Sequence, residues 1–105
     1  MASSKDYLDF ILEQLSDLDE ITYRAMIGEY IIYYKGIIIG GIYDDRFLVK
    51  NISSASSLMR QSELQLPYEG GKPMLVVDEI EDRQFLKELI EDMYTELESK
   101  KKKRP

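Results

Sequence analysis

The densest group of chemically capable side chains lies between Tyr23 and Tyr30. Arg24 offers a guanidinium group, Glu29 a carboxylate, and the two tyrosines phenols. A guanidinium beside polar groups on neighbouring strands could hold an anionic ligand if the chain forms a concave pocket there. The candidate binding residues are Tyr23, Arg24, Met26, Gly28, Glu29 and Tyr30. The alternative is structural, with Arg24 and Glu29 paired at a sheet rim, and it is favoured because exposed ion pairs are often incidental.

Two further patterns invite a chemical interpretation but lack the context that it needs. Residues 69–72 read Glu-Gly-Gly-Lys, yet they lead into Pro73 and a strand, whereas a phosphate-binding loop opens onto a helix N-terminus. The acidic residues at 44–45 and 78–82 match neither a calcium loop nor a spaced acid/base pair. Residues 69–72 are explained as a connector, and the acidic residues are explained by turn formation and by compensation of a helix dipole. We therefore predict no metal site.

Composition removes much of the usual catalytic repertoire. The 105 residues include no cysteine and no histidine, which excludes disulfides, thiol catalysis, the commonest metal ligand and the usual general base. We therefore predict no catalytic residue and no cofactor.

The distribution of charge argues against a nucleic-acid-binding core. The net charge is −6, but five basic residues form the tail Lys100, Lys101, Lys102, Lys103 and Arg104. Without them the chain carries nine basic against 20 acidic residues, a net of −11, which repels phosphate backbones. Weak binding of nucleic acid through the tail is the exception that we retain.

The chain has the length of one domain, and we expect it in the cytoplasm. Its longest apolar run, residues 37–43, is interrupted by two glycines and is far too short to span a bilayer. The first residues lack the apolar segment of a secretory signal. We predict a domain over residues 1–99 and a disordered basic tail over residues 100–105.

Apolar spacing predicts an α+β fold with a helix near each end. Residues 4–15, after an N-cap at Ser3 or Ser4, and residues 82–98 carry apolar stripes at helical spacing. Between them β-branched and aromatic residues predict a five-stranded antiparallel sheet. Its strands are residues 21–26, 29–34, 37–43, 46–50 and 74–77, with one or two helical turns at most within residues 53–60.

Short turn signals separate the first four of these strands. Lys35-Gly36 is typical of a two-residue hairpin, Asp44-Asp45 turns the chain, and Gly28 supplies a bend or a bulge. The strand over residues 37–43 is apolar on both faces, so we expect both to be covered. A homodimer interface or a flap from the middle of the chain could provide the second cover.

Residues 21–50 resemble the N-terminal domain of TfoX (Sxy) proteins, which regulate DNA-uptake competence, and the likeness extends with interruptions to about Tyr94. It is carried by Thr22, Arg24, Met26, Gly28, Tyr30 and Gly36, by residues 45–50, and by Pro67-Tyr68 with residues 70–74. The chain departs from the family pattern at Ile27 and Glu29. The resemblance implies a standalone α+β member and supplies no reaction.

These observations support two hypotheses about function. The first is a non-enzymatic regulatory or protein-interaction module that binds itself, as a homodimer, or another protein. The second is an enzyme or a small-ligand domain in which Arg24 fixes an anionic group and Tyr23, Glu29 or Tyr30 supplies polar contacts. Neither the partner nor the pathway can be named from the residues.

Overall fold

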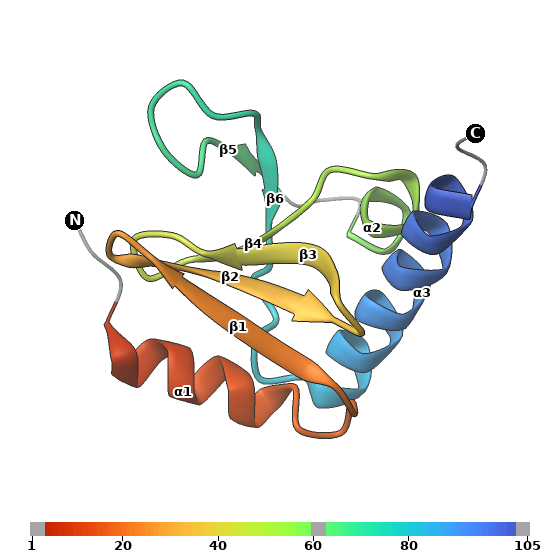
Figure 1. Ribbon diagram of the computed structural model, residues 1–105, viewed down its shortest axis with the longest axis horizontal. Helices are drawn as coiled ribbons and strands as arrows, with labels where there is room; N and C mark the ends of the chain where they lie inside the picture. The colour runs from red at the N-terminus through yellow and green to blue at the C-terminus, as the bar shows by residue number, and fades with distance from the viewer. Residues whose placement is uncertain (1–3, 60–62, 103–105) are drawn as a thin grey trace.

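A computed structural model of the chain describes residues 4–59 and 63–102 and shows a six-stranded sheet with helices at both ends (Figure 1). The strands lie in the order β1-β2-β3-β4-β6-β5, and every neighbouring pair is antiparallel. The elements are α1 (Lys5–Gln14), β1 (Ile21–Met26), β2 (Glu29–Tyr34), β3 (Ile37–Ile42), β4 (Phe47–Val49), α2 (Ser53–Leu58), β5 (Leu64–Gln65), β6 (Met74–Val76) and α3 (Arg83–Lys102).

This arrangement confirms the α+β class and the antiparallel sheet, but the predicted number of five strands is wrong. The additional strand, β5, has only two residues and pairs with β6 at the edge of the sheet. Two residues are too few for an alternating apolar pattern, so periodicity does not reveal such a strand.

The two long helices begin at capping side chains, and one of them runs further than predicted. Ser4 Oγ accepts a hydrogen bond from the Tyr7 N–H at 3.1 Å, and Asp82 Oδ1 accepts from the Phe85 N–H at 3.0 Å. Helix α3 continues to Lys102, four residues beyond the predicted end at Glu98. The first three residues of the predicted disordered tail are therefore helical, whereas residues 103–105 lie outside the described residues.

Three tight turns connect the first four strands. The central residues are Ile27-Gly28, Lys35-Gly36 and Asp44-Asp45, and all six have positive φ values between 36° and 81°. Positive φ at both central positions defines the type I′ turn, whose twist matches that of the flanking strands. In the third turn, Tyr43 and Arg46 exchange hydrogen bonds between their N–H and C=O groups at 2.9 and 3.0 Å.

A bulge in β3 changes which isoleucines enter the core. The register with β2 shifts, because Ile32 lies opposite Gly40 while Tyr33 lies opposite Ile38, and Ile39 is the extra residue. Ile39 and Ile42 are consequently both fully buried in one cluster, while Ile38 is 40% exposed. Strand β3 therefore has apolar side chains on both faces, as expected, but the bulge places Ile39 and Ile42 on the core face and leaves Ile38 on the other.

Both long helices cover one face of the sheet. A single buried cluster joins side chains from α1, from α3 and from β2, β3, β4 and β6. Its fully buried members include Leu8, Ile11, Ile32, Ile39, Ile42, Phe47, Val49, Leu86, Leu89, Ile90 and Met93. Among the described residues, no helix is both long enough and apolar enough to cross a membrane.

The other face of the sheet, the outer face, is partly covered by residues 63–73, which we call the flap. The register places Arg24, Ile31, Gly41, Leu48 and Val76 on this face. In Figure 1 the flap rises from the side of the sheet that lies away from α1. A flap was one of the two covers expected from the sequence.

Gly40 allows β3 and β4 to approach closely, and this yields a first prediction. A Cβ atom on Gly40 would lie 2.2 Å from the Leu48 carbonyl oxygen and 2.7 Å from the Val49 Cα, both of which belong to the backbone. We expect Gly40→Ala to lower the free energy of unfolding by about 3 kcal/mol, because strand pairing has to shift. Urea unfolding measures this. Gly36→Asn is the control, since its site is open and Asn tolerates a positive φ; equal stabilities of the two variants would contradict the prediction.

Glu96 joins α2 to α3 and makes stability depend on pH. Glu96 Oε1 accepts the Ser54 N–H at 2.7 Å, and Glu96 Oε2 lies 2.9 Å from Lys100 Nζ. The Ser54 N–H first, and then Lys100, lower the pKa of Glu96 from 4.5 to about 2. This contribution to stability is complete above pH 4.5 and is lost as the pH falls toward 2, because the unfolded chain binds the proton more readily.

We therefore expect Glu96→Gln to destabilise the protein at pH 7 and to differ less from the parent chain at pH 2.5. Urea unfolding at both pH values provides the measurement. Glu88→Gln, an exposed position on the same helix, is the control. A destabilisation by Glu96→Gln that is the same at both pH values would show that the contact is not ionic.

Candidate functional site

The structure places the predicted binding residues around the β1–β2 hairpin but divides them between the two faces of the sheet. Tyr23 and Tyr30 lie on the face covered by α1, with their rings edge to face at 5.9 Å between centroids. Arg24 and Met26 occupy alternate positions and lie on the outer face. One pocket on one side of the sheet therefore does not hold all six residues, and their role in binding stays a prediction.

The other two predicted residues lie at or beside the turn. Gly28 forms the turn itself with a φ of 81°, so its place is explained by backbone conformation. Glu29 begins β2, and its Oε2 accepts a hydrogen bond from the Asp44 N–H at 3.0 Å. Glu29 thus connects the start of β2 to the turn between β3 and β4.

The end of this hairpin exposes apolar side chains, and we call Met26 and Ile27 the hairpin tip. Ile27 is 100% exposed and Met26 is 53% exposed. Ile27 also has a φ of 36°, a region that β-branched residues rarely occupy. The sequence analysis did not include Ile27 among the candidate binding residues. The signal was available, because a β-branched residue is unfavourable directly before the glycine of a two-residue turn.

Strand β1 forms one edge of the sheet, with backbone groups directed away from β2. The Lys35 N–H donates to the Glu20 carbonyl at 3.1 Å. With the β1–β2 register, this bond shows which residues of β1 form hydrogen bonds with β2 and which do not. Because hydrogen-bonded pairs alternate along an antiparallel ladder, Ile21, Tyr23 and Ala25 point their N–H and C=O groups outward. A shallow depression of about 630 Å³ adjoins this edge and includes Leu15 and Leu18 in its lining.

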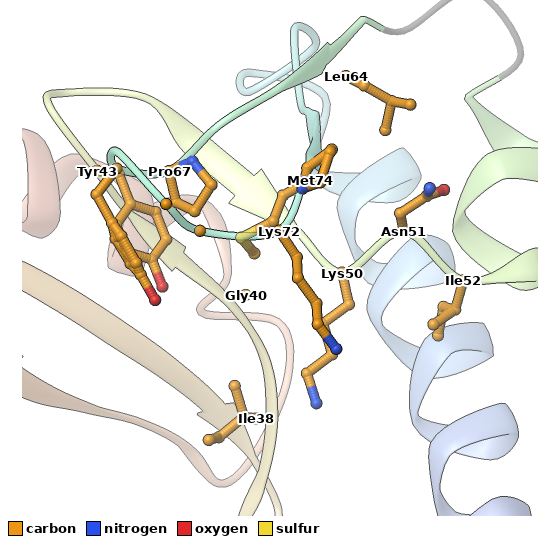
Figure 2. A pocket seen from close by; sticks show the side chains of 14 residues that line it. Ile38, Gly40, Tyr43, Lys50, Asn51, Ile52, Leu64, Pro67, Lys72 and Met74 are labelled. Carbon is orange, nitrogen blue, oxygen red and sulfur yellow. The ribbon is translucent and has the colours of Figure 1, made fainter.

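A second, larger cavity, the flap pocket, lies between the flap and the outer face. It has a volume of about 880 Å³. Ile38 of β3, Ile52 before α2, Leu64 of β5 and Met74 of β6 supply apolar surface around it (Figure 2). The pocket exists because a flap distant in the sequence folds over β3; a flap was expected as a cover, but its residues were not identified from the sequence.

The polar groups of the flap pocket are cationic or neutral. Lys50 and Lys72 line it together with the Asn51 amide, and no aspartate or glutamate contributes to the lining. Tyr43 also lines it, and burial raises the pKa of this phenol, with Tyr68 and Glu29 as lesser causes. Tyr43 therefore keeps its proton at neutral pH and remains a hydrogen-bond donor.

Besides the pairing of β5 with β6, two side-chain contacts hold the flap to the sheet. The ring of Tyr68 packs edge to face on the ring of Tyr43 at 6.1 Å between centroids. Arg46 donates from Nη1 to Gln65 Oε1 and from Nη2 to the Leu66 carbonyl at 3.2 Å, while its Nε donates to the Tyr43 carbonyl at 3.1 Å. The Arg46 guanidinium thus binds both the turn between β3 and β4 and the flap.

Gly41 makes room for the aromatic contact. A Cβ atom on Gly41 would lie 2.8 Å from Tyr43 Cε2, so a larger residue would displace the ring on which Tyr68 packs. The backbone of β2 also approaches this glycine, because the same Cβ would lie 2.6 Å from the Tyr30 carbonyl oxygen. Gly41 is therefore required both by the neighbouring strand β2 and by the ring on which the flap packs, whereas Gly40 is required by β4.

Other chemistry has less support in the geometry. Within residues 4–59 and 63–102, no three Cys, His, Asp or Glu side chains gather closely enough to hold a metal ion. In the basic tail, Lys100 pairs with Glu96 at 2.9 Å, while Lys103 and Arg104 lie outside the described residues. The predicted weak binding of nucleic acid by the tail stays a prediction.

Comparisons with known proteins leave the function open. No protein-family model matches the chain. A protein of Spirochaeta aurantia, described as an uncharacterized 12.7 kDa protein in the trpE 5′ region, is 28% identical over 80 residues, covering 76% of this chain and 70% of that protein. Its description assigns no activity, and the resemblance to TfoX proteins stays an expectation.

We expect Arg46→Lys to release the flap. A lysine has a single ammonium group and cannot donate in a planar fork to the three acceptors that Arg46 serves. Hydrogen exchange across residues 63–73 should quicken at least about fivefold, which corresponds to a local loss of about 1 kcal/mol. Arg83→Lys, at an exposed position, is the control. Unchanged exchange in the flap would show that the β5–β6 pairing and the Tyr43–Tyr68 contact secure it without Arg46.

Proposed function

We propose that this chain is a non-enzymatic regulatory module that binds protein through the β1 edge and the hairpin tip, and that its partner is a second copy of itself. The observation that carries the proposal is Ile27, an apolar and fully exposed residue in an unfavourable backbone conformation.

Ile27 contributes little to the folding of a single chain. Its side chain is 100% exposed, so it buries no apolar surface, and an L-residue in the left-handed region costs about 1–2 kcal/mol. Asn or Gly would satisfy the same turn more favourably. Burial of this isoleucine against another surface would return about 1.5–3 kcal/mol, which supports a role in association.

The β1 edge suits a symmetric antiparallel contact. It is six residues long, contains no proline and presents outward backbone groups at Ile21, Tyr23 and Ala25, as strands that pair with another chain do. Pairing centred on Tyr23 places Thr22 opposite Arg24 of the partner subunit and so avoids a direct pairing of two arginines. Both copies then use the same surface, as a two-fold axis requires.

The same register gives each hairpin tip a place to bind. Centring on Tyr23 brings Ile27 of each copy opposite Asp19 of the partner subunit, and Asp19 lines the depression beside β1. Leu15 and Leu18 line that depression as well and offer apolar surface to an incoming isoleucine. The interface would therefore be self-complementary, with two tips entering two depressions.

The remaining parts of the proposal come from the sequence. The chain has no cysteine or histidine, which favours a binding role over catalysis. The TfoX resemblance extends the proposal to regulation of the kind associated with DNA-uptake competence, and we propose the cytoplasm as the place of action.

The decisive experiment replaces Ile27 by a residue that favours the turn. We expect Ile27→Asn to raise the stability of the monomer by about 0.5–1 kcal/mol while weakening dimerisation at least about tenfold. Sedimentation between 1 and 500 µM measures the dimer, and urea unfolding measures the fold. Leu66→Asn, which removes a half-exposed apolar side chain from the flap, is the control.

A second variant tests the strand edge itself. Ala25→Pro removes an outward N–H and leaves the inward β1–β2 hydrogen bonds in place, so it should weaken the dimer without unfolding the hairpin. A parent chain that is monomeric at 500 µM would refute self-association. A dimer unaffected by both Ile27→Asn and Ala25→Pro would refute the proposed surface.

A further inference from the structure

We infer that the flap pocket is a binding site for a small amphipathic carboxylate, with the carboxylate between Lys50 and Lys72 and the apolar part against Ile38, Leu64 and Met74. The site lies apart from the predicted anion site at Arg24, and the inference does not depend on self-association.

The charge of the pocket is opposite to that of the chain. Nine basic residues precede the tail against 20 acidic residues in the chain, yet the lining of this pocket includes two lysines and no carboxylate. None of the ion pairs found among residues 4–59 and 63–102 involves Lys50 or Lys72. Two like charges in one pocket repel each other, and an anion bound between them would remove that repulsion.

The positions of the two lysines suit one anionic group. Lys50 comes from the sheet side, directly after β4, and Lys72 comes from the flap. In Figure 2 both side chains run in the same direction, and their ammonium groups lie to one side of the space above Ile38, with the ring of Tyr43 on the other side. A bound anion would therefore contact both walls of the pocket and hold the flap closed.

The size and the apolar surface indicate an organic ligand rather than an inorganic ion. A volume of about 880 Å³ falls within the range of about 300–1,000 Å³ that is typical of small-molecule sites. Ile38 is 40% exposed and Leu64 52% exposed, so both offer apolar surface that a ligand could bury. An acyl or aromatic chain would cover this surface and leave the charged end beside the lysines.

The glycine turn favours a carboxylate over a phosphate. Phosphate-binding loops direct several free backbone N–H groups at the ligand. Here the Gly71 N–H donates to the Tyr68 carbonyl at 3.0 Å and is already occupied, and the turn leads into β6 rather than a helix. The two ammonium groups, on the same side of the space above Ile38, remain as the donors for a single carboxylate.

The test uses octanoate as the probe and octanol and octyl phosphate as comparison ligands, all below their micelle concentrations. Titrations are followed in methyl NMR spectra of the full chain, so that shifts of Ile38 and Met74 identify the site. We expect saturable octanoate binding at least about tenfold tighter than that of octanol or octyl phosphate. Addition of 0.5 M salt should weaken octanoate binding and leave octanol binding unchanged.

Matched variants test whether the charges of Lys50 and Lys72 hold the carboxylate. Lys50→Gln and Lys72→Gln should each weaken octanoate binding at least about fivefold without altering octanol binding. Lys87→Gln removes the same charge from α3, outside the pocket, and should have no effect. Ile38→Trp fills the pocket and should abolish binding of every probe, with circular dichroism confirming the fold.

Several results would overturn the inference. These are octanoate binding no tighter than octanol, shifts confined to residues outside the pocket, an equal effect of Lys87→Gln, or no saturation by any probe. Tighter binding of octyl phosphate would overturn the assignment of the carboxylate class. Repeating the octanoate titration with Ile27→Asn, in which the proposed dimer is disrupted, keeps the two proposals separate.

Discussion

The close approach of β3 to β4 at Gly40 is the constraint on which the remaining structure depends. No side chain fits between Gly40 and the backbone of β4, and the adjacent bulge at Ile39 turns two isoleucines of β3 toward the helices. The apolar content of β3 is thereby concentrated on the face that α1 and α3 cover. The outer face keeps Gly41 and the half-exposed Ile38, which leaves space for the flap and for a pocket beneath it.

The two faces of the sheet consequently differ in chemistry as well as in packing. The helix-covered face is a continuous apolar core. The outer face carries Arg24, while Arg46 and Lys50 lie where the flap meets the sheet, so three of the nine basic residues that precede the tail lie on one side. Separation of a stable core from a cationic, partly open surface is an arrangement in which binding groups can vary without loss of the fold.

The sequence predicted those parts of the structure that depend on local patterns. The cap at Ser4, the apolar stripes of the helices and the glycine at each of the first two turns are local signals, and each was found close to its expected place. The bulge at Ile39 was not predictable, because it results from pairing with β2 and not from the residues of β3 alone. Strand β5 was missed because two residues carry no period.

The candidate sites were harder to predict for the same reason. Tyr23 and Arg24 are adjacent in sequence and were grouped by type, but adjacent residues in a strand point to opposite faces. Lys50 and Lys72, in contrast, are separated by a helix and a strand and meet only because the flap folds back. Ile27 could have been identified from its place before Gly28, since an isoleucine there conflicts with the turn.

The turn at Asp44-Asp45 joins parts of the molecule that are otherwise separate. Asp45 Oδ1 accepts the Ser4 N–H at 2.8 Å, the Asp44 N–H donates to Glu29 at 3.0 Å, and the next residue, Arg46, carries the flap. The start of α1, the turn end of the β1–β2 hairpin and the flap thus share one corner of the fold. A displacement of Arg46 would have to be accommodated at that corner, so the order of the first helical turn and the mobility of the flap are physically linked.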